Sequence, residues 1–195
     1  MLRISLAEIA HDIVRRHLCL GGIAVDATLG NGHDTQFLAE WVGDQGHVFG
    51  FDIQLQALTN TSQRLRRNGL ENRVTLFHAC HAEMLGFLPD SLLGRMQAIM
   101  FNLGYLPGAD KKLITRTKST LAAIDAAIDL LSEQGVITVL AYPGHAGGDQ
   151  ETRDLADRCA QLERRMQIQL EIILGDHHQP KSPRLFVIRK PAYLL

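Results

Sequence analysis

Apolar residues recur along this chain in two patterns: three to four residues apart in some segments, and consecutively or alternately in shorter segments between them. The first pattern is typical of amphipathic helices and the second of strands. A capping-box pattern at Ser5 and Glu8 opens the first predicted helix, and Gly21 and Gly22 end it. The predicted strands are residues 23–28, 47–51, 73–77, 96–101, 136–141, 168–174 and 185–188.

Helical segments separate most of these strands. One runs from about residue 55 to residue 67 and ends at Gly69, and a later one carries Leu155, Cys159, Leu162 and Met166 at helical spacing. Alternation of strands and helices predicts parallel pairing. The last two strands are joined by only about ten residues, too few for a helical crossover, so we expect them to pair antiparallel.

Length and composition predict a single hydrophobic core. The chain has 195 residues, 46% of them apolar, and shows no internal repeat, low-complexity tract or linker. We therefore expect one domain over residues 1–195. Its fold class is α/β, a Rossmann-like doubly wound sheet of seven strands, mostly parallel with one antiparallel strand.

Charge and cysteine usage limit the possible environments and partners. The formal net charge is −1, which excludes a generally polycationic nucleic-acid binder and leaves only local basic patches for such contacts. Three cysteines without paired spacing favour a reducing compartment. No apolar run approaches the length of a membrane span, and the first residues predict an amphipathic helix rather than a signal peptide. The sequence therefore predicts a cytoplasmic protein.

Polar residues and glycines gather directly after the predicted strands, where open α/β sheets bind their ligands. In AVDATLGNGHDT, Asp26 ends the first strand, and Gly30 and Gly32 allow the backbone to bend sharply and approach a ligand. Asp34 and Thr35 open the next helix. The spacing GxGxxT matches a dinucleotide fingerprint only in part, because a third glycine would stand at Thr35. Alone, the segment indicates either a nucleotide-like ligand or an ordinary tight turn.

The second strand ends in FGFDIQ, which places Asp52 twenty residues after Gly32. A carboxylate at this point can accept hydrogen bonds from both hydroxyls of a ribose. The alternative is an N-cap for the helix that begins near Gln54. The spacing favours ribose binding.

The third strand ends in a group that superficially resembles a metal cluster, made of His78, Cys80, His81 and Glu83. Tetrahedral zinc sites usually draw on two well-separated pairs of ligands, and the sequence offers no second pair. We therefore expect no metal. His81 is a candidate for contact with the edge of an adenine, and a capping role is equally open.

The fourth and fifth strand ends carry candidate substrate groups. FNLGYLPGADK puts Asn102 and Tyr105 after a buried strand, where the amide carbonyl can accept an N–H bond from an amine and the ring can pack on a planar substrate or near a cation. AYPGHAGG puts Tyr142 and His145 where they could frame a substrate mouth. The alternatives are a Gly/Pro turn with Tyr105 as a packing residue, and an ordinary loop around His145.

Together, DATLGNGHDT, GFDIQ, FNLGYLPGADK and YPGHAGG resemble the small bacterial family long labelled as rRNA methylases. The resemblance covers about residues 7–190, and the characterised members of that family are tRNA wobble-uridine methyltransferases with a fold similar to class I S-adenosylmethionine enzymes. Ala109 stands where the family commonly carries glycine, a departure that concerns only the local loop.

This resemblance implies S-adenosylmethionine as cofactor and tRNA as substrate, with methylation of the aminomethyl nitrogen of 5-aminomethyl-2-thiouridine. The cofactor-binding residues expected from the motifs are Asp26, Thr28, Gly30, Asn31, Gly32, Asp34, Thr35, Asp52, Gln54, His81 and Asn102. The expected substrate-binding residues are Gly104, Tyr105, Pro107, Asp110, Lys111, Tyr142 and His145.

Methyl transfer to an amine requires an uncharged nitrogen aimed at the methyl carbon, so positioning can supply much of the acceleration. As a hypothesis, Asn102 and neighbouring carbonyls hold the neutral amine, and Tyr105 or His145 takes its proton. Phosphate contacts are expected from one of two basic clusters. The first is Arg64, Arg66, Arg67 and Arg73, and the second is Lys111, Lys112, Arg116 and Lys118.

Other interpretations of the same residues stay open. An NAD-dependent oxidoreductase would also use Gly30, Gly32 and Asp52, although the missing third glycine and the antiparallel last strand disfavour it. A catalytically silent module could bind RNA or a metabolite through the same fold. Ribosomal RNA or a small amine could replace tRNA as substrate. The sequence does not choose between a monomer and a homodimer.

Overall fold

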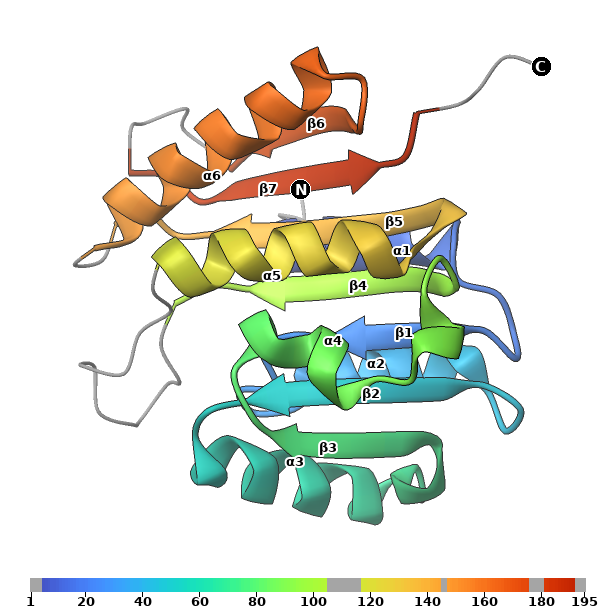
Figure 1. Cartoon of the computed structure of the whole chain (residues 1–195). Coiled ribbons are helices and arrows are strands. Elements are labelled where there is room, and N and C mark those ends of the chain that lie inside the picture. Colours follow the sequence, from blue (N-terminus) through green and yellow to red (C-terminus); the bar gives the residue numbers. More distant parts are fainter. Residues whose placement is uncertain (1–4, 105–116, 145–146, 176–180, 192–195) are drawn as a thin grey trace, which may run out of the picture.

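The computed structural model describes residues 5–104, 117–144, 147–175 and 181–191 and contains one seven-stranded sheet (Figure 1). The strands are β1 (Ile23–Asp26), β2 (His47–Asp52), β3 (Val74–His78), β4 (Met96–Asn102), β5 (Leu131–Ala141), β6 (Gln169–Leu174) and β7 (Arg184–Arg189). Their order across the sheet is β3-β2-β1-β4-β5-β7-β6. Only β7 runs against its neighbours, pairing antiparallel with both β5 and β6. The predicted fold class is confirmed.

Helices cover both faces of the sheet and make three layers. They are α1 (Leu6–Arg15), α2 (His33–Val42), α3 (Leu55–Arg67), α4 (Met84–Phe87), α5 (Thr117–Leu130) and α6 (Gly148–Arg164). In Figure 1, α4, α5 and α6 lie in front of the sheet, and α1 and α2 lie behind it. Each face has its own hydrophobic cluster: Ile99 and Ile137 belong to the front one, and Ala98 and Val136 to the rear one. Successive residues of a strand point to opposite faces, so β4 and β5 contribute to both clusters.

The first helix begins as its sequence predicts. The Ser5 Oγ accepts a hydrogen bond from the Glu8 backbone N–H at 3.2 Å, and the Glu8 carboxylate accepts one from the Ser5 N–H at 2.7 Å. These two bonds form a complete capping box and satisfy N–H groups that the first turn leaves without helical partners. In the described ranges, no helix is long and apolar enough to cross a membrane.

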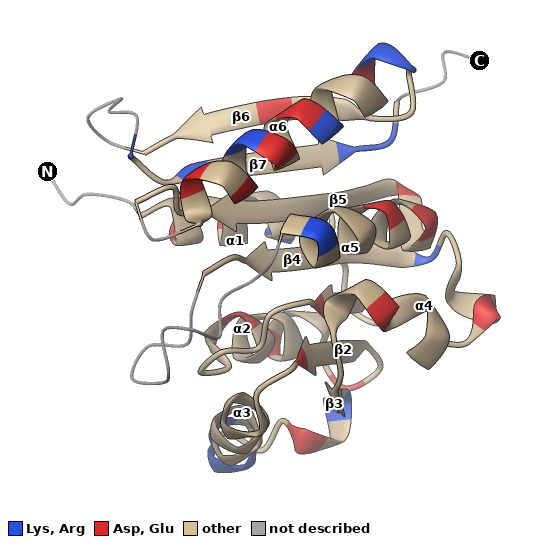
Figure 2. Ribbon diagram, turned by 60° about the vertical axis from the view of Figure 1, so that its left-hand side comes forward, with Lys and Arg blue, Asp and Glu red and all other residues tan. Residues whose placement is uncertain are grey.

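The order of the strands creates a topological switch point at one edge of the sheet. β1 lies between β2 and β4, and the chain leaves β1 toward β2 but later returns beside β1 as β4. Open α/β sheets bind ligands at such a switch point, beyond the carboxyl ends of the strands. Figure 2 brings this edge forward and shows acidic segments at the tip of β2 and on α2.

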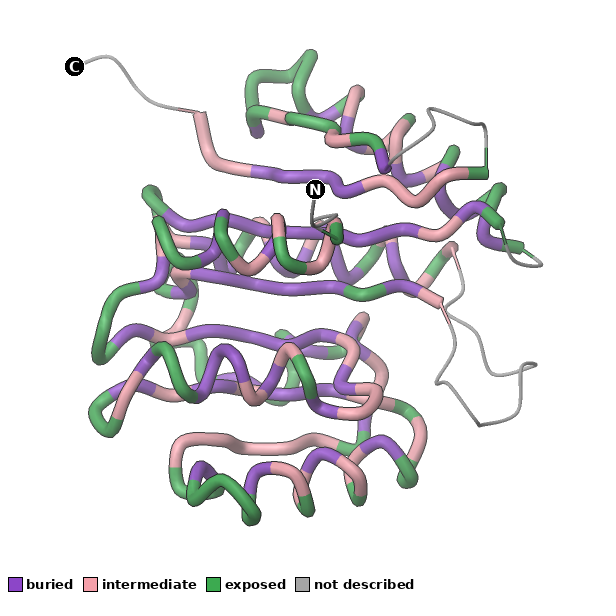
Figure 3. The backbone as a smooth tube through the Cα atoms, turned by 180° about the vertical axis from the view of Figure 1, so that it is seen from behind, coloured by how far each residue is buried: buried purple, intermediate pink, exposed green. Residues whose placement is uncertain are grey.

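Burial rises from the edge strands toward the middle of the sheet. Figure 3 shows the central strands mostly buried, whereas β3 at one edge is only half-buried. On β6, at the other edge, Ile172 is 41% exposed and Leu174 is 45% exposed. The apolar alternation that predicted β6 therefore marks a partly solvated edge strand rather than a core strand.

Some predicted boundaries are corrected by the structure. The fifth strand begins at Leu131 rather than at Val136, because the chain enters the sheet directly after α5 and its pairing with β4 shifts register between Met96 and Ala98. Met166 lies beyond the end of α6, with φ of 56° and 78% of its surface exposed. It therefore does not share the buried stripe of Leu155, Cys159 and Leu162.

Candidate functional site

The candidate site begins at the carboxyl end of β1 with a fully buried acid. Asp26 accepts hydrogen bonds from the Thr28 backbone N–H at 3.1 Å and from the Thr35 hydroxyl at 2.6 Å. Burial, with a smaller contribution from the nearby negative charge of Asp34, raises the pKa of Asp26 from 3.8 to about 7. The loop after β1 is therefore tied to a carboxyl group that changes charge near neutral pH.

The glycine turn that follows is fixed against the end of β2. Gly30 has φ of 52° and donates its N–H to Asp52 at 3.1 Å. Gly32 has φ of 75°, and a Cβ added there would lie 2.9 Å from the Thr61 Cα of α3. Both the backbone conformation and the close approach require glycine at position 32.

Asp52 is held in one orientation by two backbone donors. One of its oxygens accepts the Gly30 N–H, and the other accepts the Gln54 N–H at 2.9 Å. Each carboxylate oxygen has a second lone pair that can accept another donor. The next residue, Ile53, is 51% exposed although it is apolar. The end of β2 thus offers an oriented acceptor pair beside an apolar surface, a combination that suits a ribose and its base.

The end of β4 is joined to the same loop. The Asn102 backbone N–H donates to the Thr28 hydroxyl at 2.7 Å, and its side-chain amide donates to Asp34 at 3.4 Å. The other oxygen of Asp34 lies 2.7 Å from the His11 Nε2. These hydrogen bonds therefore join four residues at the switch point: His11 of α1, Thr28 of the loop after β1, Asp34 of α2 and Asn102 of β4.

The end of β5 contributes Tyr142, which packs partly buried against the rear cluster. Burial raises the pKa of Tyr142, with a smaller contribution from the negative charge of Asp34. Gly104 follows β4 with φ of 143°. The other expected catalytic and substrate residues lie outside the described residues: Tyr105, Pro107, Asp110, Lys111 and His145.

His81 is brought to the site, but as a buried residue. Its Nδ1 lies 3.1 Å from the Ala27 carbonyl oxygen, and its Nε2 has no hydrogen-bond partner. Burial lowers the pKa of His81, so the neutral imidazole is favoured and the Nδ1–H donates to the carbonyl. The Nε2 is therefore an orphaned acceptor facing inward.

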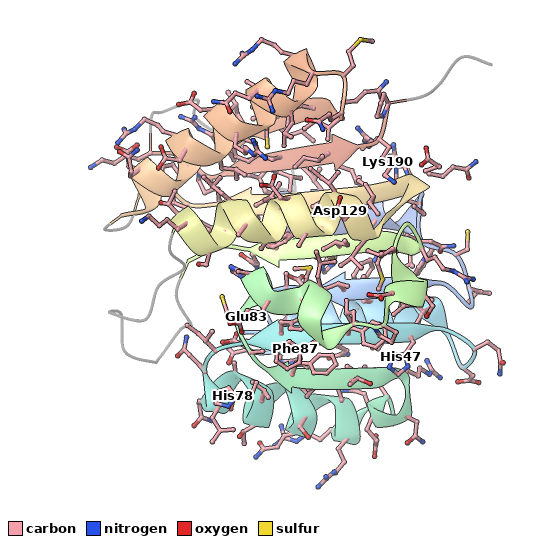
Figure 4. The ribbon with its side chains drawn as sticks, viewed as in Figure 1. His47, His78, Glu83, Phe87, Asp129 and Lys190 are labelled. Atoms are coloured by element: carbon pink, nitrogen blue, oxygen red, sulfur yellow. The ribbon has the colours of Figure 1, made fainter. Side chains whose placement is uncertain are left out.

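The residues that resembled a metal cluster do not assemble. His78 and Glu83, both labelled in Figure 4, are exposed, and the His78 Nε2 bonds to the Ile53 carbonyl oxygen at 2.9 Å. Among the described residues, no group of three or more histidines, cysteines and acids is placed to hold a metal ion.

Asn31 faces α3 rather than the end of β2. Its side-chain oxygen accepts from Asn60 at 2.9 Å, and its backbone oxygen accepts from the Arg64 Nε at 2.8 Å. Of the expected cofactor residues, the structure joins Asp26, Thr28, Thr35 and Asn102 in one network and Gly30, Asp52 and Gln54 in another. Asn31 is joined instead to a third group.

Two residues of the site, His11 and Ile53, are not identified by the sequence pattern. His11 stands 23 positions before Asp34 on a helix whose periodicity indicates only packing, so no sequence signal links the two. Ile53 could have been recognised, because an apolar residue directly after a strand-end acid has no core to enter. The contact between His11 and Asp34 can be found only from the folded structure, whereas Ile53 could have been found from the end of the second strand alone.

The electrostatics of the site suit a cationic adenosyl ligand. Asp26 lies close enough to Asp34 and Asp52 for both to raise its pKa. In the part of the chain that the structure describes, the ion pairs join none of these three acids to a lysine or arginine. A ligand with a ribose diol, an ammonium and a sulfonium would supply the hydroxyl donors and positive charge that this arrangement accepts.

Strand order, the reversed β7 and the acid at the end of β2 define a protein of the class I methyltransferase fold. The chain belongs to the family described as "Putative rRNA methylase", which matches residues 48–189. A crystal structure from Clostridium thermocellum described as a putative rRNA-methylase is 35% identical, with a TM-score of 0.90 and coverage of 98% of this chain and 100% of that one.

Two further relatives extend the comparison. A structure from Streptococcus mutans, described as a putative methyltransferase in complex with SAH, is 29% identical with a TM-score of 0.83 over 98% of this chain and 100% of that one. The protein named tRNA (mnm(5)s(2)U34)-methyltransferase, chloroplastic, from Arabidopsis thaliana is 37% identical over 157 residues, which are 76% of this chain. The match spans only 57% of the plant protein.

The buried acid at the end of β1 gives a testable dependence of stability on pH. Because the folded-state pKa of Asp26 is about 7 and its ordinary value is 3.8, the folded state holds this proton more tightly than the unfolded state. The free energy of unfolding of the ligand-free wild type should therefore fall as pH rises from 5 to 7. Asp26→Asn imitates the protonated acid and should be more stable than wild type at pH 8 by up to about 4 kcal/mol.

Urea unfolding of both proteins at pH 5 and pH 8 measures this effect. The difference between them should be smaller at pH 5 than at pH 8, because the folded protein still holds the Asp26 proton at pH 5, and it should approach zero only below about pH 3.8, where the unfolded state is protonated as well. A difference that stays the same at both pH values would contradict the proposed charge state.

Proposed function

We propose that this protein is an S-adenosylmethionine-dependent methyltransferase that acts on tRNA. One observation carries the proposal: three carboxyl groups, Asp26, Asp34 and Asp52, gather at the switch point of a class I methyltransferase sheet, and the described ion pairs give none of them a lysine or arginine. The name of the Streptococcus mutans structure, which holds SAH, supports the same ligand class.

The residues proposed to hold the cofactor divide by its parts. Asp52 accepts the ribose hydroxyls, and Ile53 packs against the base. Gly30 and Gly32 let the backbone approach closely, and the buried Asp26 holds this loop through the Thr28 N–H and the Thr35 hydroxyl. When bound, the cofactor supplies a methyl group activated by a sulfonium. Asn31 holds the cofactor loop to α3 instead of contacting the ligand.

The substrate proposal rests on Asn102 and on the plant relative. Because the Asn102 amide donates to Asp34, its carbonyl oxygen is oriented away and can accept an N–H from an amine. The Arabidopsis protein is named for a methyltransferase of mnm5s2U34 in tRNA. We therefore propose the aminomethyl nitrogen of the wobble uridine as the acceptor, with Gly104 and Tyr142 beside it. Tyr105, Pro107, Asp110, Lys111 and His145 remain proposed substrate residues.

The continuous sheet from β3 to β6 supports one domain over residues 1–195 as part of the same proposal. In the proposed reaction, the residues of the site hold an uncharged amine in line with the methyl carbon. Burial of the bound amine would disfavour its charged ammonium form. A cytoplasmic location, expected for such a substrate, belongs to the proposal as well.

Two measurements test the function. Calorimetry with S-adenosylmethionine and with NAD should show binding of the first only. Purified protein incubated with S-adenosylmethionine and tRNA from cells lacking the gene should convert aminomethyl-thiouridine to its methylated form, as read by nucleoside mass spectrometry. Methylation of undermodified ribosomal RNA instead of tRNA would move the substrate to rRNA, and cofactor binding without turnover on either RNA would favour a silent module.

A polar hollow beside the cofactor loop is the proposed contact for tRNA phosphates. It encloses about 330 Å³ between the loop after β1 and α3, and its lining contains two arginines, Arg64 and Arg67. The other lining residues are Asn31, His33, Asn60, Gln63 and Asn68. Positive charge and amide donors without a carboxylate suit a phosphate. Figure 2 shows the basic segment of α3 at the lower end of the molecule.

Within the expected basic cluster, the structure separates two kinds of arginine. Arg64 bonds to Asn31, Gln36 and His33. Its side chain therefore lines the hollow and also holds the loop after β1 to α3. Arg73 is paired with Asp44 and bonds to the Ala39 carbonyl oxygen, which removes it from the candidates. In the second cluster only Lys118 lies within the described residues, where it is exposed.

Arg67→Ala is expected to raise the KM for tRNA about 3- to 10-fold and to leave kcat within about twofold, because a phosphate contact positions the substrate without touching the reacting atoms. The slope of log affinity against log salt should fall by about one. Arg153→Ala, an exposed arginine on α6 paired with Asp149, is the matched control and should change neither value. An unchanged KM in Arg67→Ala would remove the hollow from the tRNA surface.

A further inference from the structure

Helix α1 places His11 beside Asp34, on the side of the site where Asn102 is proposed to hold the acceptor amine. The His11 Nε2 lies 2.7 Å from one Asp34 oxygen, and the side chains are only 20% and 13% exposed. The imidazole stacks on Phe37, with 3.9 Å between ring centroids and 7° between planes. This stacking fixes the ring so that its Nε2 points at the carboxylate. Contact with solvent is retained on the remaining exposed side.

Asp34 links His11 to Asn102 at the end of β4. Its second oxygen is 3.4 Å from the Asn102 amide nitrogen, at the end of β4. Burial raises the pKa of Asp26 at the end of β1 and of Tyr142 just after β5, and the negative charge of Asp34 adds a smaller contribution to each. Asp34 is therefore bonded at the end of β4 and acts electrostatically on residues at the ends of β1 and β5.

The charged groups around His11 itself are few. On its own helix, Glu8 has its pKa lowered by hydrogen bonds to Ser5, and the charge of His11 adds a smaller contribution. From the same helix, the Arg15 guanidinium lies 5.0 Å from the centre of the Phe37 ring and is paired with Asp12. Among the ion pairs of the described residues, His11 is joined only to Asp34.

We propose that Asp34 receives the acceptor amine and takes its proton, and that His11 is a positioning residue that orients Asp34 and passes the proton to solvent. This inference rests on the proposed methyltransferase function. It also assigns proton removal to residues other than Tyr105 and His145.

The ammonium form of the acceptor gives one proton to the Asp34 carboxylate, and His11 relays it to water. The freed lone pair forms the N–C bond while the C–S bond breaks, and that electron pair stays on sulfur as a neutral thioether. The product is a methylated ammonium that leaves with its own proton or gives it up by the same path.

The test compares His11→Gln with wild type across pH. Glutamine can still donate a hydrogen bond to Asp34 but cannot carry a proton onward. We expect kcat at pH 7 to fall about 10- to 100-fold. The ratio of wild-type to variant kcat should shrink as pH rises toward 10, because an alkylamine with an ordinary pKa of about 10 is then already about half neutral in solution. A constant ratio from pH 7 to pH 10 would indicate a merely structural role and overturn the proposal.

Cofactor affinity provides a second readout that does not depend on turnover. Asp34→Asn removes one of the three carboxyl charges at the site, so it should raise the Kd for S-adenosylmethionine, measured by calorimetry, by less than about tenfold while it lowers kcat about 100-fold at pH 7. A rise in Kd that matches the loss of kcat would show that Asp34 holds the ammonium of the cofactor instead, and the proposal would be wrong. Thermal unfolding of each variant establishes that it is folded.

Asp12→Asn is the matched control on the same helix, because Asp12 is exposed and bonds only to Arg15 in the described contacts. It should behave as wild type in both measurements. If the wild type binds the cofactor and methylates no amine, the proposed function fails. If it methylates and the ratio for His11→Gln does not vary with pH, only the proton path fails.

Discussion

Asp52→Ala is expected to weaken S-adenosylmethionine binding about 100- to 1000-fold. The side chain offers two oriented oxygens to the ribose diol, and each charge-assisted hydrogen bond contributes roughly 1.5–3 kcal/mol. Its loss also frees the Gly30 and Gln54 N–H groups that fix the turn. Calorimetry measures the change in Kd.

Two variants sharpen this expectation. Asp52→Asn keeps one side-chain acceptor and should weaken binding only about tenfold. Asp44→Ala alters an exposed acid just before β2, at the opposite end of that strand, and should leave the Kd unchanged. Equal affinity in wild type and Asp52→Ala would mean that the ligand does not lie at the end of β2.

Gly32→Ala should lower the free energy of unfolding by about 3 kcal/mol. The left-handed backbone at φ of 75° costs any other residue roughly 1–2 kcal/mol. The new methyl would also lie 2.8 Å from the Thr61 Oγ1 and 2.9 Å from its Cα, so α3 must move away from the loop, at an overpacking cost of roughly 1–3 kcal/mol. Urea denaturation measures the loss.

Gly69→Ala separates these two costs. Gly69 has φ of 66°, but a Cβ there would meet nothing within 4 Å. This variant should therefore lose only the backbone part, roughly 1–2 kcal/mol. Similar losses for both variants would show that the contact between Gly32 and Thr61 relaxes without cost.

Much of the site was predictable because its residues sit at strand ends. Each predicted strand stops at a polar residue or a glycine, and parallel strands bring their carboxyl ends to one edge, so Asp26, Asp52 and Asn102 could be grouped from sequence. Local pattern and sheet geometry were sufficient for these inferences.

Other features depended on packing that the sequence does not encode locally. Met166 continues the helical period of α6 but lies past its end, in a left-handed conformation on the surface. His81 was expected as a candidate for the edge of an adenine, and only the fold shows it buried with an orphaned Nε2 beneath the loop after β1. Burial of this kind depends on neighbours from several elements.

The sequence by itself determined the class of fold, the reversed seventh strand and the edge of the sheet where the polar residues meet, because hydrophobic period and connection length are local properties of the chain. The tertiary structure alone decided which side chains touch. It turned Asn31 toward α3, raised the pKa of Asp26 by burying it, and placed His11 against Asp34. Such contacts join residues from separate elements, and their energies depend on distance and burial, which exist only once the layers have packed.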